Sequence, residues 1–394
     1  MTTEQKVAPG TKDRVAYGGV SPDINTGASN GREVMAEPQA DAGPVNHAAA
    51  HAGFNYHGGP VVVCPLVYMA FWGSAWTANA AQFARANRLT QFTKDMIASK
   101  YMNVLSQYGS GFGAGSGGVI RTTYVGSVPN VLTGGNITST LQACINSGAL
   151  PEPSKPSNQC VMIFLADGMS VNAGGIRMCQ PTSDTAFGFH SFFTTTKGNK
   201  CYYAVIPSLN NACLQASCGS DAGCSLHLAQ NQEQRQTQVA SHEFSEMISD
   251  PELNAWFENG SGQENSDIVN GQSATITISG RTWTVQRQYS KADDIASNGA
   301  NFSVVEAPNP LPRLAGGPAS GTGAARIAPD VQPYSRLLPL PSVHFDAQTS
   351  QTTVDDREMK EYTKQVFHPL KPEHIMHDFP AFLTQMVSAL GKNN

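Results

Sequence analysis

Three short apolar runs place the strongest limit on the fold of this chain. Residues 66–72, 161–165 and 202–206 are almost continuously apolar. Strands covered on both faces have such unbroken runs, whereas strands with one wet face alternate apolar and polar residues. The runs therefore predict the central strands of a sheet. Between the first two, residues 89–108 carry apolar side chains at helical spacing, which predicts a helix or a broken pair of helices.

Composition and charge exclude several classes of protein. The chain has 394 residues, of which 40% are hydrophobic and 14% charged, so it can bury a sizeable core. Its net charge is −5 and it has no run of Lys and Arg, so we expect no nucleic-acid partner. No apolar run is long enough for a transmembrane segment. The opening MTTEQKVAPGTKDR lacks the apolar stretch of a signal peptide.

The distribution of polar residues and prolines predicts four parts. Residues 1–55 are polar and without hydrophobic periodicity, which indicates a flexible leader. Residues 56–307 form the main domain, and a hairpin is expected over 275–286, with its turn at Ser279 and Gly280. Residues 308–345 contain eight prolines and predict a linker.

The last part, residues 346–394, is predicted to be a helical tail. Its apolar residues follow helical spacing on one face. We expect this face to dock in cis or against a second subunit, with a separate partner or a membrane surface as the alternatives. The residues of this face are Phe379, Phe382, Leu383, Met386, Val387 and Leu390.

The cysteines are even in number and lie in the middle of the chain, as in a disulfide framework. The last three lack the close CxxC spacing of a structural zinc site, so disulfides are favoured over a cysteine metal site. The eight are Cys64, Cys144, Cys160, Cys179, Cys201, Cys213, Cys218 and Cys224.

The segment QTQVASHEFSEMISDP, residues 236–251, carries the chemistry. Apolar residues at helical spacing predict a helix that ends before Pro251. His242 and Glu246 stand one turn apart on it, so both side chains can reach one cation, and Glu243 lies beside them as a candidate general base. The alternative is a surface helix on which these side chains face water.

The segment departs from the usual zinc motif, HExxH, in having a second acid where the second His stands. A catalytic zinc site needs three protein ligands and an open position for water. Glu264 and Asp267 follow after a turn-rich stretch, and either carboxylate could be the third ligand. Two carboxylates would make zinc a weaker Lewis acid, so a slow enzyme or a different divalent metal is possible.

The same residues resemble a known family. SHEFSEMISDP, followed by NAWF and ENSD, resembles the SHExxExxTDP, NAWY and EIGD run of the phosphate-induced, or EXORDIUM-like, proteins. NYHGGPVVVCPLVYMAFWG resembles the opening strand of that family, and GFHSFF and WTVQRQYS correspond to later segments. The resemblance covers residues 55–294. Asn265 and Ser266 depart from EIGD, and the Cys that follows it in many relatives is absent.

The resemblance implies a zincin-like metallopeptidase core, in which an active-site HExxE helix lies beneath a mixed sheet. By position it implies His242 and Glu246 as metal ligands, Glu243 as the base, and Glu264 and Asp267 as the remaining ligand and its supporter. His190 and Tyr289 fall in shared segments and are candidate donors to an oxyanion.

These observations predict an α/β metal-dependent hydrolase, a zinc metallopeptidase that acts on a peptide or a cell-wall-associated substrate. The alternative is a non-enzymatic binding or signalling protein with a structural metal site, and a third possibility is a chain without metal. The family is extracellular or cell-wall-associated, which implies the same location here, while the lack of a visible signal peptide leaves the cytoplasm open.

Overall fold

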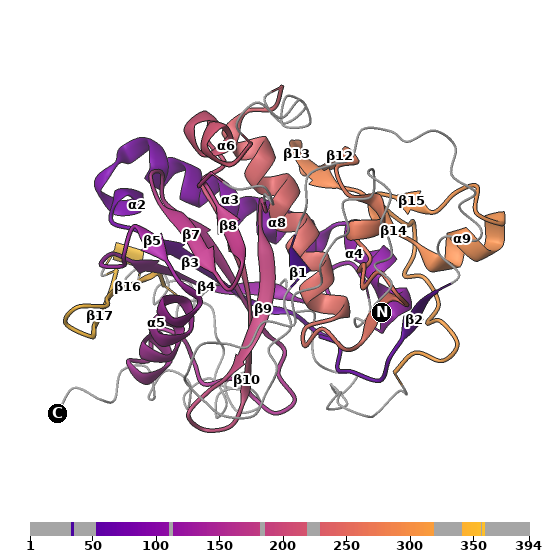
Figure 1. The fold of residues 1–394 in the computed structure, drawn as a ribbon, viewed down its shortest axis with the longest axis horizontal. Helices are drawn as coiled ribbons and strands as arrows, with labels where there is room; N and C mark the ends of the chain where they lie inside the picture. The colour runs from indigo at the N-terminus through magenta and orange to yellow at the C-terminus, as the bar shows by residue number, and fades with distance from the viewer. Residues whose placement is uncertain are drawn as a thin grey trace, which may run out of the picture.

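The protein is built around one eight-stranded sheet with strand order β1-β9-β10-β6-β3-β4-β16-β17 (Figure 1). The computed structural model describes residues 33–34, 53–109, 113–181, 186–218, 229–318, 341–355 and 357–358. In sheet order the strands are Glu33–Val34, Phe189–Thr194, Lys200–Ile206, Gln159–Leu165, Leu66–Trp72, Gly118–Val125, Val343–Asp346 and Gln351–Val354.

The three apolar runs form neighbouring strands at the centre of this sheet. β10, β6 and β3 lie side by side and run parallel, and β4 and β16 continue the parallel part. All seven residues of β6 are buried, as an unbroken apolar run requires. β9 and β17 run antiparallel to their neighbours at the two ends, so the predicted mixed sheet in an α/β protein is confirmed.

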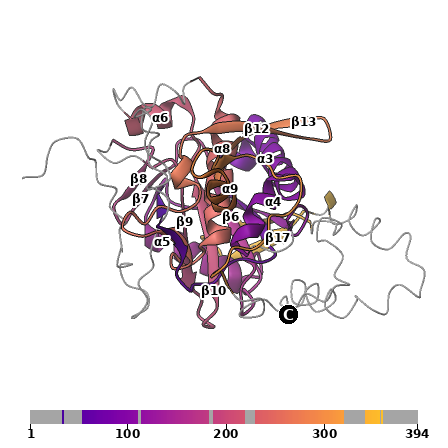
Figure 2. The same cartoon turned by 90° about the vertical axis from the view of Figure 1, so that its right-hand side faces the viewer.

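Helices cover both faces of the sheet. The predicted broken pair is confirmed as α3, Ala80–Ala98, followed by α4, Tyr101–Leu105, and the 3-10 turn Ser106–Tyr108. α3 connects β3 to β4, whereas α5, Gly134–Asn146, connects β4 back to β6. Because parallel crossovers are right-handed, connections that move in opposite directions along a sheet place their helices on opposite faces. Figure 2 shows α5 on one side and α3 on the other.

Helix α8, Gln232–Ser249, contains the HExxE segment and packs against α3 and the strands β9, β10 and β6. A capping box of Asn231 and Gln234 starts it, and it ends where Pro251 forbids continuation. Every residue from 235 to 249 is buried. The predicted apolar stripe is therefore in the core, but the opposite face is also in the interior and does not face water.

The predicted hairpin is confirmed as β12, Ser273–Ile278, and β13, Arg281–Gln286. Ser279 and Gly280 both have positive φ, which two-residue hairpin turns need. Asp95 on α3 accepts hydrogen bonds from Arg281 Nε at 2.7 Å and from Trp283 Nε1 at 2.8 Å. These bonds attach the hairpin to α3, and β13 packs along α8.

Smaller elements surround this core. They include a three-stranded sheet and two two-stranded sheets besides the hairpin. No helix in the described part of the chain is long and apolar enough to cross a membrane. The bounds are α2 Ala75–Ala78, α6 Asn211–Cys218, η2 Asp267–Val269, α9 Lys291–Ser297, β2 Phe54–Tyr56, β5 Val131–Leu132, β7 Ser170–Ala173, β8 Ile176–Met178, β11 Trp256–Glu258, β14 Gln288–Tyr289 and β15 Ser303–Val304.

The chain after the proline-rich region corrects one prediction. A linker was expected to end at residue 345 and a helical segment to begin at 346, but β16 and β17 form a hairpin across this boundary, which extends the main sheet beside β4. Val343 and Phe345 are buried and alternate with half-exposed His344 and Asp346, which is the period of a strand. The helical face around Phe379 lies outside the described residues, as does the leader apart from residues 33–34 and 53–55.

The cysteines confirm that the chain has a disulfide but correct the expected disulfide framework. Cys179 and Cys213 form a disulfide. Cys64, Cys144, Cys160 and Cys201 are buried free thiols, so half of the eight cysteines belong to the core and not to a disulfide framework. Buried free cysteines behave as small apolar residues, which fits the places of these four in the core, on β6, on β10, on α5 and just before β3. The side chains of Cys218 and Cys224 lie outside the described residues.

The capping box gives a test of what starts α8. Asn231→Ala removes the oxygen that accepts a hydrogen bond from Gln234 N at 3.0 Å. We expect the free energy of unfolding to fall by about 1 kcal/mol, measured by urea denaturation followed by circular dichroism. Asn231→Ser restores a capping oxygen and should recover most of the loss. Equal stability of Asn231→Ala and the wild type would contradict the role of the Asn231 cap in starting α8.

Candidate metal centre

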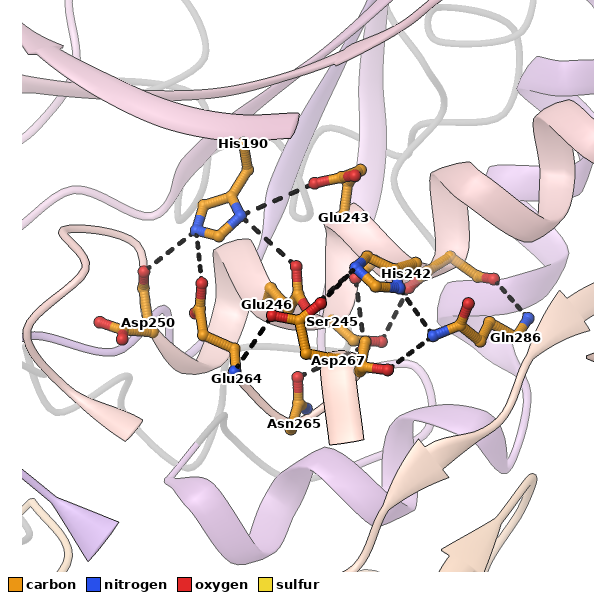
Figure 3. Close-up of polar contacts among 12 residues, drawn as sticks. His190, His242, Glu243, Ser245, Glu246, Asp250, Glu264, Asn265, Asp267 and Gln286 are labelled. Carbon is orange, nitrogen blue, oxygen red and sulfur yellow. Dashed lines mark hydrogen bonds and ion pairs between the residues drawn. The ribbon is translucent and has the colours of Figure 1, made fainter. Parts of the chain in front are cut away.

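Three residues of the site lie on α8. His242, Glu243 and Glu246 are all fully buried, which excludes a surface helix on which they face water. His242 Nε2 lies 3.0 Å from Glu246 Oε1, as expected for residues one turn apart. Figure 3 shows these side chains within a compact polar cluster.

The chain after α8 brings acids back to the helix. Asp250 caps the helix end, and its Oδ1 accepts hydrogen bonds from the backbone N–H groups of Asn254 and Ala255, both at 2.6 Å. Burial raises the pKa of Asp250 to about 7, and the two backbone donors partly oppose the rise. These bonds give Asp250 a structural role in the turn after the helix.

The two candidate third ligands lie at different histidines. Ser266 Oγ donates to the carbonyl of His242 at 3.3 Å and fixes this loop against α8. Asp267 Oδ1 lies 3.8 Å from His242 Nε2. Glu264 Oε2 instead lies 3.6 Å from His190 Nε2. Asp267 is therefore the acid that joins His242 and Glu246, and Glu264 is on the far side of His190.

His190 enters the cluster from β9. Its Nδ1 lies 3.7 Å from Glu243 Oε2 and 3.7 Å from Glu246 Oε2, and the whole side chain is buried. Burial lowers the pKa of His190 to about 3, with His242 acting in the same direction, so its imidazole is neutral at neutral pH. The sequence pointed to His190 as an oxyanion donor, and the structure places it directly between two carboxylates.

Gln286, at the end of β13, is a site residue that the sequence did not reveal. Its Nε2 lies 2.6 Å from His242 Nδ1 and donates to the carbonyl of Ser266 at 2.8 Å. The amide N–H can only donate, so Nδ1 accepts in this contact and the hydrogen of the neutral ring is on Nε2, which faces Glu246 and Asp267. A cation at Nε2 would require the amide to turn so that its oxygen accepts from Nδ1–H. The only signal in the sequence was a polar residue at the end of a hairpin strand.

Glu243 lies against a glycine of the segment that leads into β9. A Cβ atom on Gly188 would stand 2.6 Å from Glu243 Oε1 and 2.6 Å from Val239 Cγ1, so only glycine leaves room for this carboxylate. Among the described residues, neither oxygen of Glu243 has a hydrogen-bond partner. Burial raises the pKa of Glu243 well above its ordinary value, and nearby Glu246 adds to the rise.

Tyr289 meets the loop of the cluster through its backbone, because its N–H donates to the carbonyl of Asn265 at 3.0 Å. Its hydroxyl donates to Asp294 Oδ2 at 2.7 Å, and its ring packs edge-on against Phe54. Burial raises the pKa of this hydroxyl. The contacts give Tyr289 a place in the packing between β14 and α9, and its role as an oxyanion donor stays a prediction.

The cluster fits a divalent cation. Two groups of side chains each present ligand atoms that lie within 4.8 Å of one another: His242 with Glu246 and Asp267, and His190 with Glu243 and Glu246. Imidazole nitrogens and carboxylate oxygens are the usual ligands of zinc and of several other divalent metals. The first group contains His242 and Glu246, which the sequence predicted as ligands, and of the two candidates for the third ligand it contains Asp267 and not Glu264.

Comparisons with models of protein families, with curated proteins and with solved structures find no match to this chain. The resemblance to EXORDIUM-like proteins therefore stays a prediction, and the function has to be argued from the geometry of the site.

The space at Gly188 gives a test of the site. Gly188→Ala forces Glu243 and Val239 to move, so we expect a loss of about 1–3 kcal/mol in the free energy of unfolding. Gly126→Ala is the matched control, since a Cβ there meets nothing within 4 Å, and it should change stability by less than about 0.5 kcal/mol. Equal effects of the two substitutions in urea denaturation would contradict the tight packing at Glu243.

Gln286 gives a second test. Gln286→Ala frees the imidazole of His242, and we expect the affinity for zinc to fall by about 10–100-fold, as for other residues that orient a metal-ligating His. Gln288→Ala is the control, because Gln288 is also buried but donates to Tyr101 O at 3.1 Å. Competition with a chromophoric chelator measures both affinities. A similar loss in the two variants would show that Gln286 has no specific effect on the metal.

Proposed function

We propose that this protein is a metal-dependent hydrolase, a zinc or other divalent-metal peptidase in which Glu243 is the general base. The observation that carries the proposal is the convergence of His242, Glu246 and Asp267, whose ligand atoms lie within 4.8 Å of one another beside Glu243. Three protein ligands of this type and an adjacent acid are the composition of a catalytic zinc site.

The chemistry of the donor atoms supports a bound ion. His242 Nε2 faces Glu246 and Asp267, and Gln286 holds the ring from its other nitrogen. A divalent ion at this place supplies Lewis acidity, which polarises a carbonyl oxygen and makes a water molecule easier to deprotonate. Glutamate at position 246 in place of a second His also favours hard divalent metals alongside zinc.

Glu243 has the properties that a general base needs. Burial raises its pKa, which makes its carboxylate a better proton acceptor than an exposed Glu. Both of its oxygens lack hydrogen bonds to the described residues, so they are available to accept a proton from an attacking water. Glu243 would then pass this proton to the leaving amine, as the base of a peptidase does.

His190 is the predicted catalytic residue that lies closest to this base, 3.7 Å from Glu243 Oε2. A neutral imidazole has one N–H and can donate a hydrogen bond to a developing oxyanion. His190 is the better candidate of the two because it lies beside Glu243, whereas the hydroxyl of Tyr289 donates to Asp294 on α9. The substrate class, a peptide or a cell-wall-associated molecule, and an extracellular location rest on the family resemblance alone.

A structural metal site is the second candidate, and the burial of the cluster favours it. His190, His242, Glu243, Glu246, Glu264 and Asp267 are each exposed by 3% or less. A metal that only stabilises the fold needs no access for a substrate, whereas a catalytic metal keeps a position open to one. In this case the protein would be a binding or signalling protein whose surface loops contact a partner.

Glu243→Gln separates these functions. If Glu243 is the base, the variant should keep the ion held by His242, Glu246 and Asp267 but lose about 100–10,000-fold in turnover of a fluorogenic peptide library. Metal content by mass spectrometry and near-UV circular dichroism establish that the ion and the fold are retained.

The matched control is Glu252→Gln, which removes the charge of a partly buried acid that accepts a hydrogen bond from Tyr202 at 3.0 Å. This variant should keep its activity. Wild-type protein that contains metal but cleaves no peptide in the library would favour the structural site, and full activity of Glu243→Gln would contradict the assignment of the base.

A further inference from the structure

The carboxylate of Glu246 lies between the two histidines of the cluster and directs one oxygen to each (Figure 3). Oε1 is 3.0 Å from His242 Nε2, and Oε2 is 3.7 Å from His190 Nδ1. Carboxylates in this position bridge the ions of two-metal sites, where the ions stand about 3.5–4 Å apart. A single ion would use only one side of this arrangement.

Each side of Glu246 has its own set of ligands. His242 and Asp267 complete the group on one side, and His190 and Glu243 complete the group on the other. The proposed hydrolase uses the first group only. The second group also combines an imidazole with carboxylate oxygens, which is the ligand chemistry of a divalent cation.

The hydrogen bonding of His190 shows which nitrogen can bind a cation. Nε2 lies 3.3 Å from the backbone carbonyl of Asp250. A carbonyl oxygen can only accept, so Nε2 carries the hydrogen in this bond, and the lone pair of the neutral ring is on Nδ1. That lone pair is directed at oxygens of Glu243 and Glu246, both 3.7 Å away. A lone pair facing two ionised carboxylates repels them unless a cation or a proton lies between.

Glu264 and the backbone carbonyl of Asp250 contact Nε2 of His190, the ring nitrogen opposite Nδ1. Glu264 Oε2 lies 3.6 Å from Nε2, on the side away from Glu243. Carboxylates and backbone carbonyls at the outer nitrogen of a metal-ligating His fix its tautomer and raise its basicity. His190 therefore has the surroundings of a metal ligand.

The charge of the cluster also exceeds what one divalent ion balances. Glu243, Glu246, Glu264 and Asp267 are buried acids and together carry up to four negative charges, twice the charge of one divalent ion. Buried charges are stable only where they are paired or coordinate a metal. Two divalent ions would match the four carboxylates.

We propose that this cluster binds two divalent cations, bridged by Glu246, with one ion on His242 and Asp267 and the other on His190 and Glu243. The inference rests on the proposed function for the first ion and adds the second. It assigns His190 to the ligands instead of the oxyanion donors. Glu243 can ligate through one oxygen and keep the other as a proton acceptor.

The experiment counts the ions in the full chain. Protein purified without a metal-affinity tag is saturated with zinc, desalted and measured by mass spectrometry against protein concentration. We expect about two zinc ions per wild-type chain and about one in each of His190→Ala and His242→Ala. Glu246→Ala should hold close to none. The control His57→Ala removes an exposed imidazole that stacks on Phe257 and should keep about two.

The outcomes separate this inference from the function on which it rests. One zinc ion in the wild type, kept by His190→Ala and lost by His242→Ala, would overturn the second ion and leave the hydrolase proposal intact. No zinc in the wild type would overturn both. Loss of only one ion in Glu246→Ala would overturn the bridge.

Manganese-loaded wild type gives a measurement that does not depend on the folding of any variant. Two bridged manganese ions are magnetically coupled, so the electron paramagnetic resonance spectrum should lack the six-line signal of isolated ions. A full six-line signal in protein that contains about two manganese ions per chain would contradict the bridge.

Discussion

The burial of α8 on all sides is the constraint on which the rest of the structure depends. A helix with an imidazole and two carboxylates on one face normally turns that face to water, because burying an unpaired charge costs several kcal/mol. Here residues 235–249 are all in the interior. The neighbouring elements therefore surround the buried groups with further polar side chains, and together these side chains form the site.

Three distant segments supply them. β9 brings His190, the loop after α8 brings Glu264 and Asp267, and β13 brings Gln286. Each segment is itself fixed by bonds outside the cluster. β9 is held by its pairing with β10, the loop by the cap at Asp250, and the hairpin by the bonds of Arg281 and Trp283 to Asp95. The geometry of the site is thus a product of the sheet and of α3 as much as of α8.

Local sequence patterns were enough to predict several helices and strands, but not which of them lie side by side in the fold. The apolar runs gave β3, β6 and β10, and helical spacing with Pro251 gave α8, since these signals come from residues close in the sequence. The place of His190 depends on β9 lying beside α8, which no local pattern records. Gln286 was missed for the same reason. β16 was missed because a four-residue strand after a proline-rich region carries a weak signal. The cysteines suggested a disulfide framework because an even number of cysteines is compatible both with disulfides and with buried free thiols.

The charge of the buried carboxylates links the stability of this core to the protons or cations that bind to them. Without a cation, the buried side chain of Glu243 is stable mainly in its protonated form, which is the meaning of its raised pKa. A raised pKa in the folded state means that the acid favours folding at low pH and that this contribution is lost as the pH rises past its unfolded-state value. A cation takes the place of the proton and removes that loss, because it pairs with the charged form. If the proposed ion binds, the same arrangement that makes α8 costly to bury at neutral pH would link the stability of the fold to the occupancy of the site.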